Sequence, residues 1–209
     1  MSDRRDGASA GTGLVFILSG PAGSGKTALA RMLRTEEPTV HFCITATTRS
    51  PRPGERDGVD YLFYSEPEFL LRAERGEFLE FARVPPIVGN LYGTPEAEVY
   101  GPLSRGCDVF LQVDVQGARS VRAKIPTAVS IFLRPPDIDA LRRRLSSRGT
   151  ETNDDLERRL ANAMVEMASE PEFTYTVINA EGRLSAAVAH VRAIMTIERA
   201  RWRASRQNS

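Results

Sequence analysis

The chain has 209 residues, 41% of them hydrophobic and 26% charged, with a formal net charge of +1. The length and composition are typical of a globular domain with small insertions. The net charge lacks the basic excess that a general nucleic-acid binder carries. The two cysteines, Cys43 and Cys107, lack C-x-x-C spacing, and the cysteines and histidines do not follow the spacing of a zinc-binding motif, which predicts neither a disulfide framework nor a zinc site. We therefore expect a protein of the reducing cytoplasm.

Residues 1–13 are polar and small, so we expect a disordered N-terminal tail rather than a signal peptide. The apolar run at residues 14–18 is far shorter than the ~20 residues that cross a bilayer, and it predicts a buried parallel strand. From Thr27 onward, apolar residues recur at helical spacing. The chain thus opens with a strand, a turn and a helix, and we expect no membrane contact.

Residues 45–95 interrupt this pattern. They are rich in glycine, proline, tyrosine and charge, and they contain two short β-like pieces, "YLFY" and "EFLEFARV". We interpret them as an insertion on the core rather than as a separate domain.

Beyond residue 95 the alternation resumes. Residues 109–113, 128–133 and 173–178 predict strands, each followed by a helical pattern, and residues 142–159 form a second insertion that is dense in arginine. Alternating strands and helices predict an α/β fold of three layers, with a parallel sheet covered on both faces. We expect one domain over residues 14–205, whose core is residues 14–44, 96–141 and 160–205.

The turn after the first strand, "GPAGSGKT", matches G-x-x-x-x-G-K-[ST]. Glycines let successive backbone N–H groups point at a phosphate, and the following helix N-terminus adds positive potential. The cradle would be Gly20, Pro21, Ala22, Gly23, Ser24 and Gly25. Lys26 would reach the β- and γ-phosphates, and the Thr27 hydroxyl would bind Mg²⁺. This motif predicts a nucleoside-triphosphate site.

The motif leaves the reaction open, because GTPases, ATPases and small-molecule kinases share it. The stretch "DVQG" has the D-x-x-G pattern of GTPases, but no N-K-x-D or T-K-x-D follows to recognise guanine in GTP. A second anion site is favoured by Arg49 and Arg52, which lie three apart in a proline-stiffened loop and can direct two guanidinium groups at one anion. The hydroxyls of Tyr61 and Tyr92 could donate to the same oxygens.

Five further segments occur in the same order as in guanylate kinase: "TTRSPRPGERDGVDY", "GEFLEFA", "GNLYGTP", "VDVQGARSV" and "RGTETNDDLERRL". With the phosphate loop, the resemblance covers nearly all of residues 14–192. It implies a phosphate-loop α/β core with a GMP-binding α+β insertion and a small helical lid. It also implies an ATP:GMP phosphotransferase that gives ADP and GDP, uses Mg²⁺ with ATP and accepts dGMP, with no protein partner.

The resemblance further implies site residues. The GMP phosphate would be held by Arg49, Arg52, Tyr61 and Tyr92, and the guanine by Thr45, Glu80, Thr94 and Asp114. The ATP site would add Arg144 and Asn179 to the loop, with Asn179 near the adenine. Arg148 and Arg159, and with them Arg144, would belong to the lid, and the catalytic residues would be Lys26, Arg49, Arg148 and Arg159.

The chemistry agrees with these roles. One carboxylate, such as that of Glu80, can accept both the N1–H and the exocyclic amine of guanine, whereas adenine presents a lone pair at N1. Lid arginines would offset charge on the transferring phosphoryl group, and no general base is needed because the acceptor phosphate is already anionic. We interpret His41 and His190 as structural residues.

Two positions depart from the family pattern. Gln112 stands where an acidic residue is common, which predicts weaker Mg²⁺ binding or slower turnover. The segment before "GNLYGT", with Pro85 and Pro86, is longer than usual and predicts an outward loop.

Two alternatives remain open. One is a guanylate-kinase-like module that binds phosphorylated peptides without catalysis, although the intact phosphate loop disfavours it. The other is a kinase for another nucleoside monophosphate.

Overall fold

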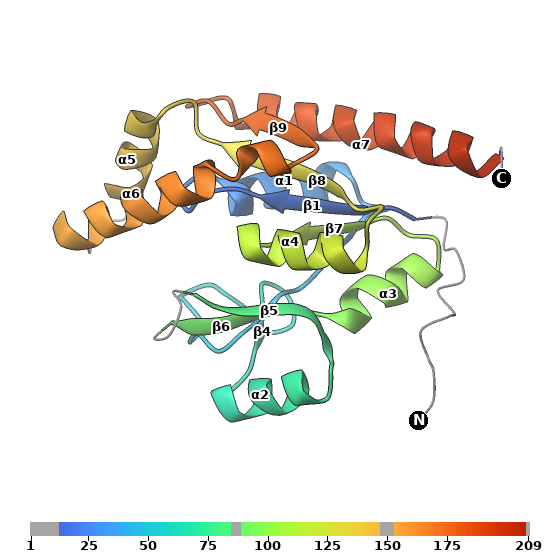
Figure 1. The fold of residues 1–209 in the computed structure, drawn as a ribbon, viewed down its shortest axis with the longest axis horizontal. Helices are drawn as coiled ribbons and strands as arrows, with labels where there is room; N and C mark the ends of the chain where they lie inside the picture. The colour runs from blue at the N-terminus through green and yellow to red at the C-terminus, as the bar shows by residue number, and fades with distance from the viewer. Residues whose placement is uncertain (1–12, 85–88, 147–152, 208–209) are drawn as a thin grey trace. The chain divides into compact units, whose positions relative to one another are not determined.

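The computed structural model describes residues 13–84, 89–146 and 153–207 (Figure 1). The chain divides into two compact units. Unit 1 comprises Met1–Val15, Thr39–Leu111 and Arg119–Ala128, and unit 2 comprises Phe16–Pro38, Gln112–Ala118 and Val129–Ser209.

A five-stranded sheet has the strand order β2-β7-β1-β8-β9. Its strands are β1 (Val15–Ser19), β2 (His41–Phe42), β7 (Val109–Gln112), β8 (Val129–Arg134) and β9 (Tyr175–Ile178). The pairs β2–β7, β1–β8 and β8–β9 are all parallel. The α/β fold with a parallel sheet, predicted from the alternation of strands and helices, is thereby confirmed.

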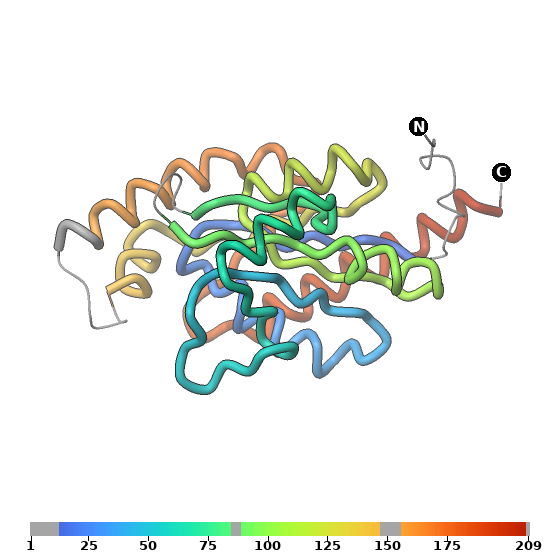
Figure 2. Tube along the Cα trace, turned by 90° about the horizontal axis from the view of Figure 1, so that it is seen from below, coloured from blue at the N-terminus to red at the C-terminus, as the bar shows by residue number. Residues whose placement is uncertain are grey.

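Unit 2 carries the helices that follow the strands β1, β8 and β9. They are α1 (Lys26–Glu36), α5 (Ile138–Ser146), α6 (Asn153–Met167), the 3₁₀ turn η1 (Glu170–Glu172) and α7 (Leu184–Gln207). Helices α5 and α6 lie side by side in both views (Figures 1 and 2), joined by the buried side chains of Leu141, Leu145, Leu160 and Ala163. The helix α4 (Val115–Lys124) follows β7.

The packing of α1 on α7 includes ion pairs from Glu36 and Glu37 to arginines of α7. Glu37, at the end of α1, accepts from Arg192 Nε at 2.9 Å and from Arg199 Nη1 at 3.1 Å, both on α7. Burial opposes ionisation of Glu37, but the two guanidinium groups outweigh it and lower its pKa. The last helix is thereby held against the first.

Unit 1 contains a second sheet, with the order β4-β3-β6-β5. Its elements are β3 (Ala46–Thr47), β4 (Leu62–Phe63), α2 (Glu66–Glu74), β5 (Phe78–Val84), β6 (Asn90–Pro95) and α3 (Glu96–Ser104). Phe69 of α2 is fully buried and stacks on Phe78 of β5, with 4.4 Å between ring centroids. The antiparallel pair β5–β6 places Glu80 directly opposite Thr94.

Several element ends differ from those expected. The first strand begins at Val15 because the Leu14 N–H donates to the Asp108 side chain instead of to the sheet. The last strand begins at Tyr175 because the Phe173 N–H closes the turn η1 and the Thr174 N–H donates to the Ser130 hydroxyl. The helix α3 was not expected, and α2 falls within the insertion for which the resemblance implied an α+β structure without bounds for its helix.

Among the described residues, no helix combines the length and the apolar character needed to cross a membrane. The expected tail at residues 1–13 falls almost wholly outside the described residues, as do Pro85 and Pro86.

Candidate functional site

The phosphate loop of unit 2 runs from Gly20 to Gly25, between β1 and α1, as the motif predicts. Gly20 has φ of +139°, and a Cβ there would lie 2.2 Å from the Leu133 carbonyl oxygen of β8. Gly25 has φ of +97°, and a Cβ there would lie 2.4 Å from Asn179 Nδ2. Only glycine satisfies both the backbone conformation and the space at these two positions.

Lys26 is the first residue of α1, and its ammonium group folds back across the loop. Its Nζ donates to the Gly20 carbonyl oxygen at 2.6 Å and to the Pro21 carbonyl oxygen at 3.1 Å. Thr27 follows in the same turn with an exposed side chain. The cation therefore lies at the start of a chain of backbone donors, which is the arrangement that binds a phosphate tail.

The Ser24 carbonyl oxygen is held by two side chains from distant segments. Asn179, which follows β9 and is buried, donates its Nδ2 at 2.8 Å. Arg144 of α5 donates to the same oxygen at 3.3 Å and to the Asn179 carbonyl oxygen at 2.7 Å. Both residues were predicted to belong to the ATP site, and the structure places both against the backbone of the loop.

Glu166 of α6 reaches the loop as well, and no sequence signal pointed to it. Its Oε2 accepts from the Ala22 N–H at 3.1 Å, across 144 residues of sequence. Burial raises the pKa of Glu166, the charge of Lys26 and the Ala22 N–H oppose that rise, and the charge of Asp114 adds to it. A carboxylate thus accepts a hydrogen bond from one of the backbone N–H groups that the motif predicts will bind phosphate.

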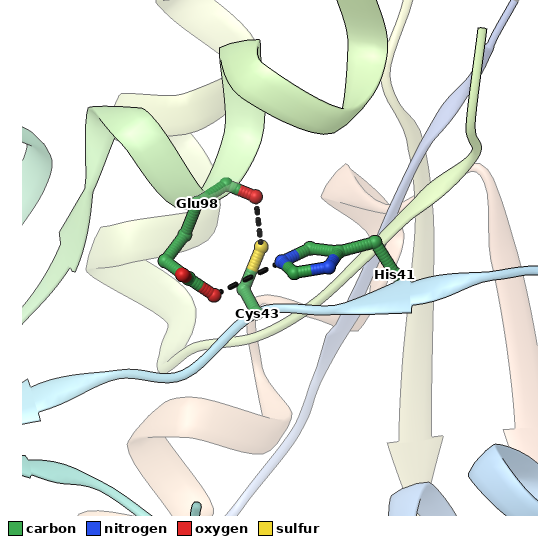
Figure 3. Close-up of side chains that lie close together, drawn as sticks. All are labelled: His41, Cys43 and Glu98. Atoms are coloured by element: carbon green, nitrogen blue, oxygen red, sulfur yellow. Dashed lines mark hydrogen bonds and ion pairs between the residues drawn. The ribbon is translucent and has the colours of Figure 1, made fainter. Parts of the chain in front are cut away.

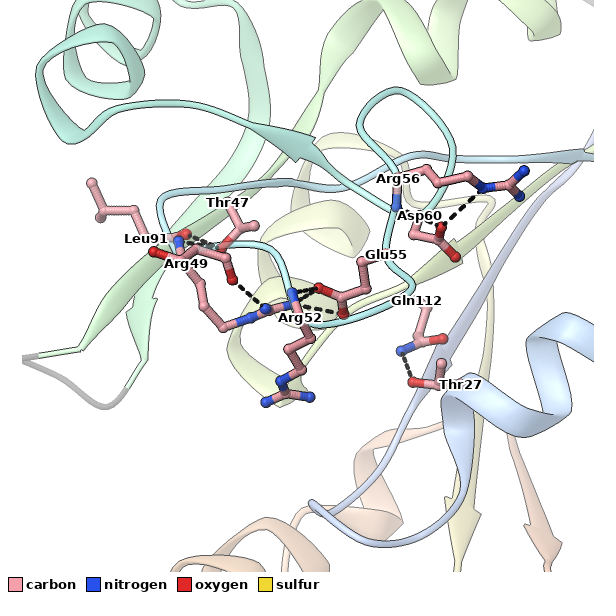
Figure 4. Close-up of polar contacts among 10 residues, drawn as sticks. Thr27, Thr47, Arg49, Arg52, Glu55, Arg56, Asp60, Leu91 and Gln112 are labelled. Carbon is pink, nitrogen blue, oxygen red and sulfur yellow. Dashed lines mark hydrogen bonds and ion pairs between the residues drawn. The ribbon is translucent and has the colours of Figure 1, made fainter.

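Gln112, at the end of β7, lies beside Thr27. Its Nε2 donates to the Thr27 hydroxyl at 3.2 Å (Figure 4). A hydroxyl and a neutral amide oxygen fit Mg²⁺, which takes oxygen ligands and usually keeps several waters and substrate phosphates around it. The pair supplies no negative charge of its own.

Asp114 also belongs to unit 2. Its Oδ1 accepts from the Gly117 N–H at 2.7 Å, which caps the first turn of α4. Asp114, which was predicted to bind guanine, therefore also caps the N-terminus of α4.

In unit 1, Arg49 is held by an acidic residue of its own loop. One of its terminal nitrogens, Nη2, donates to both carboxylate oxygens of Glu55 at 2.9 Å, and Nη1 donates to the Ser50 carbonyl oxygen at 2.6 Å. Glu55 also accepts from the Arg52 N–H at 2.8 Å, whereas the Arg52 guanidinium extends away from Glu55 (Figure 4). Glu55 therefore fixes the loop that carries the two arginines predicted to hold the GMP phosphate.

The two predicted tyrosines lie beside Arg49. The Arg49 guanidinium is 5.3 Å from the centroid of the Tyr61 ring, and the rings of Tyr61 and Tyr92 are 6.4 Å apart. Burial raises the pKa of Tyr61, and Tyr92 raises it further, so its hydroxyl keeps its proton and can donate. The structure thus brings Arg49, Tyr61 and Tyr92 together.

Two of the predicted guanine contacts in unit 1, Glu80 and Thr94, lie opposite each other on the β5–β6 pair. The buried Thr94 hydroxyl donates to Glu80 Oε1 at 2.6 Å, which fixes the carboxylate. Thr45 precedes β3, and its carbonyl oxygen accepts from the Leu62 N–H at 3.0 Å.

Only some of the arginines that were predicted to belong to the lid lie within the described residues. Arg148 lies outside the described residues, and Arg159 is half-buried on α6.

Comparison with known proteins finds relatives along most of the chain. A family model described as "Guanylate kinase" matches residues 13–198. The chain is 44% identical over 183 residues to a guanylate kinase of Dechloromonas aromatica, covering 88% of each chain. It is 48% identical over 163 residues to one of Streptomyces coelicolor, covering 78% of this chain and 81% of that one. A crystal structure of guanylate kinase from Anaplasma phagocytophilum superposes with a TM-score of 0.74 at 27% identity, covering 92% and 89% of the two chains.

Replacing Gly25 tests the space that the loop leaves for Asn179. In Gly25→Ala the new Cβ would meet Asn179 Nδ2 at 2.4 Å, so we expect affinity for a nucleoside triphosphate to fall by more than about tenfold. Isothermal titration measures it. The control is Gly54→Ala, which has a similar φ of +86° but no neighbouring atom within 4 Å. An equal loss of affinity in the control would contradict this account of Gly25.

Glu166→Gln tests the half-buried carboxylate at the loop through the pH dependence of stability. Because burial raises the folded pKa of Glu166 above its ordinary value of 4.5, the unfolded chain loses this proton first as pH rises. The wild-type free energy of unfolding should therefore fall relative to that of Glu166→Gln as pH rises above 4.5, and the difference should level off above the folded pKa.

Urea unfolding of both proteins from about pH 4 to about pH 8 measures this difference. Glu157→Gln, an exposed position on the same helix, controls for the change in net charge. A difference between wild type and Glu166→Gln that stays constant over this range would contradict the prediction.

Proposed function

The chain belongs to the guanylate kinase family and is an ATP:GMP phosphotransferase, and on that premise we propose which of its residues bind each nucleotide and how they promote the transfer. The loop geometry supports this division of roles most directly. A helix N-terminus, a glycine-built turn and an ammonium group converge at residues 20–27, as a triphosphate requires.

On the donor side, the backbone N–H groups of the loop and Lys26 bind the phosphates of ATP. Arg144 and Asn179 contribute by fixing the Ser24 carbonyl oxygen, which sets the direction of the neighbouring N–H groups. Their effect on ATP is therefore exerted through the loop. The Glu166 carboxylate competes with phosphate for the Ala22 N–H, so ATP binding has to displace or share that contact.

On the acceptor side, Arg49, Arg52, Tyr61 and Tyr92 bind the GMP phosphate. Guanidinium groups and protonated phenols both donate to phosphate oxygens, and Glu55 holds Arg49 in place for that contact. Thr45, Glu80, Thr94 and Asp114 bind the guanine. A carboxylate offers two oxygens, so Glu80 can accept from Thr94 and still accept from both guanine donors.

The transfer itself needs positioning and charge stabilisation. An oxygen of the GMP phosphate attacks the γ-phosphorus of ATP, the bond to the β–γ bridging oxygen breaks, and ADP leaves. Lys26 stabilises the charge that develops on the donor side, and Arg49 orients the attacking phosphate. The lid over residues 142–159 brings Arg148 and Arg159 to the equatorial oxygens and excludes water.

Mg²⁺ bound with ATP neutralises phosphate charge at this site. Thr27 and Gln112 are the residues that would hold it, mainly together with phosphate oxygens and water. We also assign residues 45–95 to the GMP-binding insertion and the protein to the cytoplasm.

The acceptor preference is tested by ADP release from ATP and Mg²⁺ with GMP, dGMP, AMP, CMP, UMP or dTMP. We expect strong dependence on GMP and dGMP, and loss of transfer in Lys26→Met. In Glu80→Gln, the loss of a charged acceptor should raise the KM for GMP by about 10- to 100-fold, with a smaller effect on kcat.

Glu74→Gln, an exposed position on α2, is the matched control and should behave as wild type. Unchanged GMP kinetics in Glu80→Gln would show that the guanine contact is misassigned. ADP release that is independent of every monophosphate would refute the transferase function.

Gln112→Asp tests the metal site. A carboxylate beside Thr27 adds the negative charge that the native pair lacks, so the Mg²⁺ concentration for half-maximal activity should fall several-fold. Gln116→Asp, exposed on α4, adds the same charge nearby and should leave that midpoint unchanged. If both variants, or neither, lower the midpoint, Gln112 is not beside the metal.

A further inference from the structure

Unit 1 contains a cluster of three potential metal ligands outside the nucleotide-binding residues. His41 lies on β2, Cys43 follows that strand, and Glu98 lies in the first turn of α3 (Figure 3). The imidazole nitrogen, the thiol sulfur and a carboxylate oxygen all lie within 4.8 Å of one another. Within the described residues, this is the one group of three or more such side chains close enough to share an ion.

The three side chains already contact one another. His41 Nε2 lies 3.0 Å from Glu98 Oε2, and the Cys43 thiol donates to the Glu98 backbone carbonyl oxygen at 3.2 Å. The Ile44 N–H donates to Glu98 Oε2 at 3.0 Å, which orients the carboxylate toward the other two groups. All three residues are partly buried, and the His41 and Glu98 side chains retain exposed fractions of 32% and 25%. An ion can therefore enter from solvent.

We propose that His41, Cys43 and Glu98 form a binding site for one Zn²⁺ ion or a similar borderline divalent cation. Imidazole, thiolate and carboxylate are the three ligand types that zinc uses in proteins, and a site with three protein ligands leaves a fourth position for water. The cluster is distinct from the Mg²⁺ position at Thr27. The proposal is independent of the phosphotransferase assignments.

The observed separations fit such an ion after small movements. Metal–ligand bonds of about 2.0–2.3 Å in a tetrahedron place ligand atoms roughly 3.3–3.8 Å apart. The contact between His41 and Glu98 has to open by a few tenths of an ångström, and the longest separation has to close by at most about 1 Å, which side-chain rotation can supply.

Binding of the ion requires the Cys43 thiol to lose its proton, and the charge of the ion offsets the free-energy cost of that loss. Burial raises the pKa of the Cys43 thiol well above its ordinary value, and the Glu98 carboxylate raises it further, so the thiol holds its proton without a cation. A divalent cation reverses both effects, because it stabilises the thiolate and takes the carboxylate as a ligand. The His41 proton then resides on Nδ1, which leaves Nε2 to bind the ion.

The donor set excludes the ion used for catalysis. Mg²⁺ prefers oxygen ligands, and thiolate and imidazole favour Zn²⁺ or Co²⁺. Bound zinc would connect β2 to α3 through metal–ligand bonds, in place of the hydrogen bonds that connect them without metal. Because such an ion binds only the folded chain, it should raise the thermal stability of the protein.

The chain offers matched controls, since it has two cysteines and two histidines and the site uses one of each. Titration of the full chain with Co²⁺ should give one equivalent of a visible spectrum with a thiolate-to-cobalt charge-transfer band, which Zn²⁺ removes and excess Mg²⁺ does not. The band should be lost in Cys43→Ser and kept in Cys107→Ser. Affinity should fall by more than about tenfold in His41→Ala and in Glu98→Gln, but not in His190→Ala.

A second measurement needs no variant. In wild-type protein, Zn²⁺ should slow alkylation of Cys43 by iodoacetamide, read by mass spectrometry, and leave Cys107 unaffected. A band that survives in Cys43→Ser, equal protection of both cysteines, or the absence of saturable cobalt binding would overturn the proposal. Each of these results would mean that His41 and Glu98 form a hydrogen bond with each other and do not bind an ion.

Discussion

The carbonyl oxygen of Ser24 is the point on which the donor site depends. Within the motif, Lys26 fixes the first two carbonyl oxygens of the loop, whereas the Ser24 peptide is held by side chains from outside the loop. Asn179 and Arg144 both donate to its carbonyl oxygen, and the absent Cβ of Gly25 leaves the room that Asn179 needs. The loop is thus pre-organised by residues that come from β9 and α5.

Each unit also places a carboxylate on a group that is suited to bind phosphate. Glu166 accepts from the Ala22 N–H in unit 2, and Glu55 accepts from Arg49 in unit 1. Such contacts keep a donor or a cation satisfied and correctly oriented without substrate. The two contacts differ in their consequence, because Glu166 shares a donor with the incoming phosphate, whereas Glu55 orients Arg49.

Contiguous patterns allowed much of this to be predicted from sequence. The alternation of strands and helices, and the position of the glycine-rich loop between the first strand and the first helix, were predicted correctly, because each rests on residues that are close along the chain. The bounds of α2 could not be predicted because its apolar residues do not form one clear stripe. Phe69 and Ala73 pack in the core at helical spacing. The larger Leu70 and Leu71 are exposed, however, and obscure that pattern. Glu166 escaped notice because its partner is 144 residues away, a separation that no local pattern encodes.

The packing of α5 beneath the loop has a mechanical consequence. A Cβ at Gly23 would lie 3.0 Å from the leucine methyl groups of both Leu141 and Leu145, so the helix and the loop are in van der Waals contact there, and Arg144 of the same helix binds the Ser24 carbonyl oxygen. The same helix therefore contacts the loop twice, once through apolar side chains and once through a guanidinium group. A displacement of α5 would disturb both contacts, and with them the peptide that Arg144 and Asn179 hold.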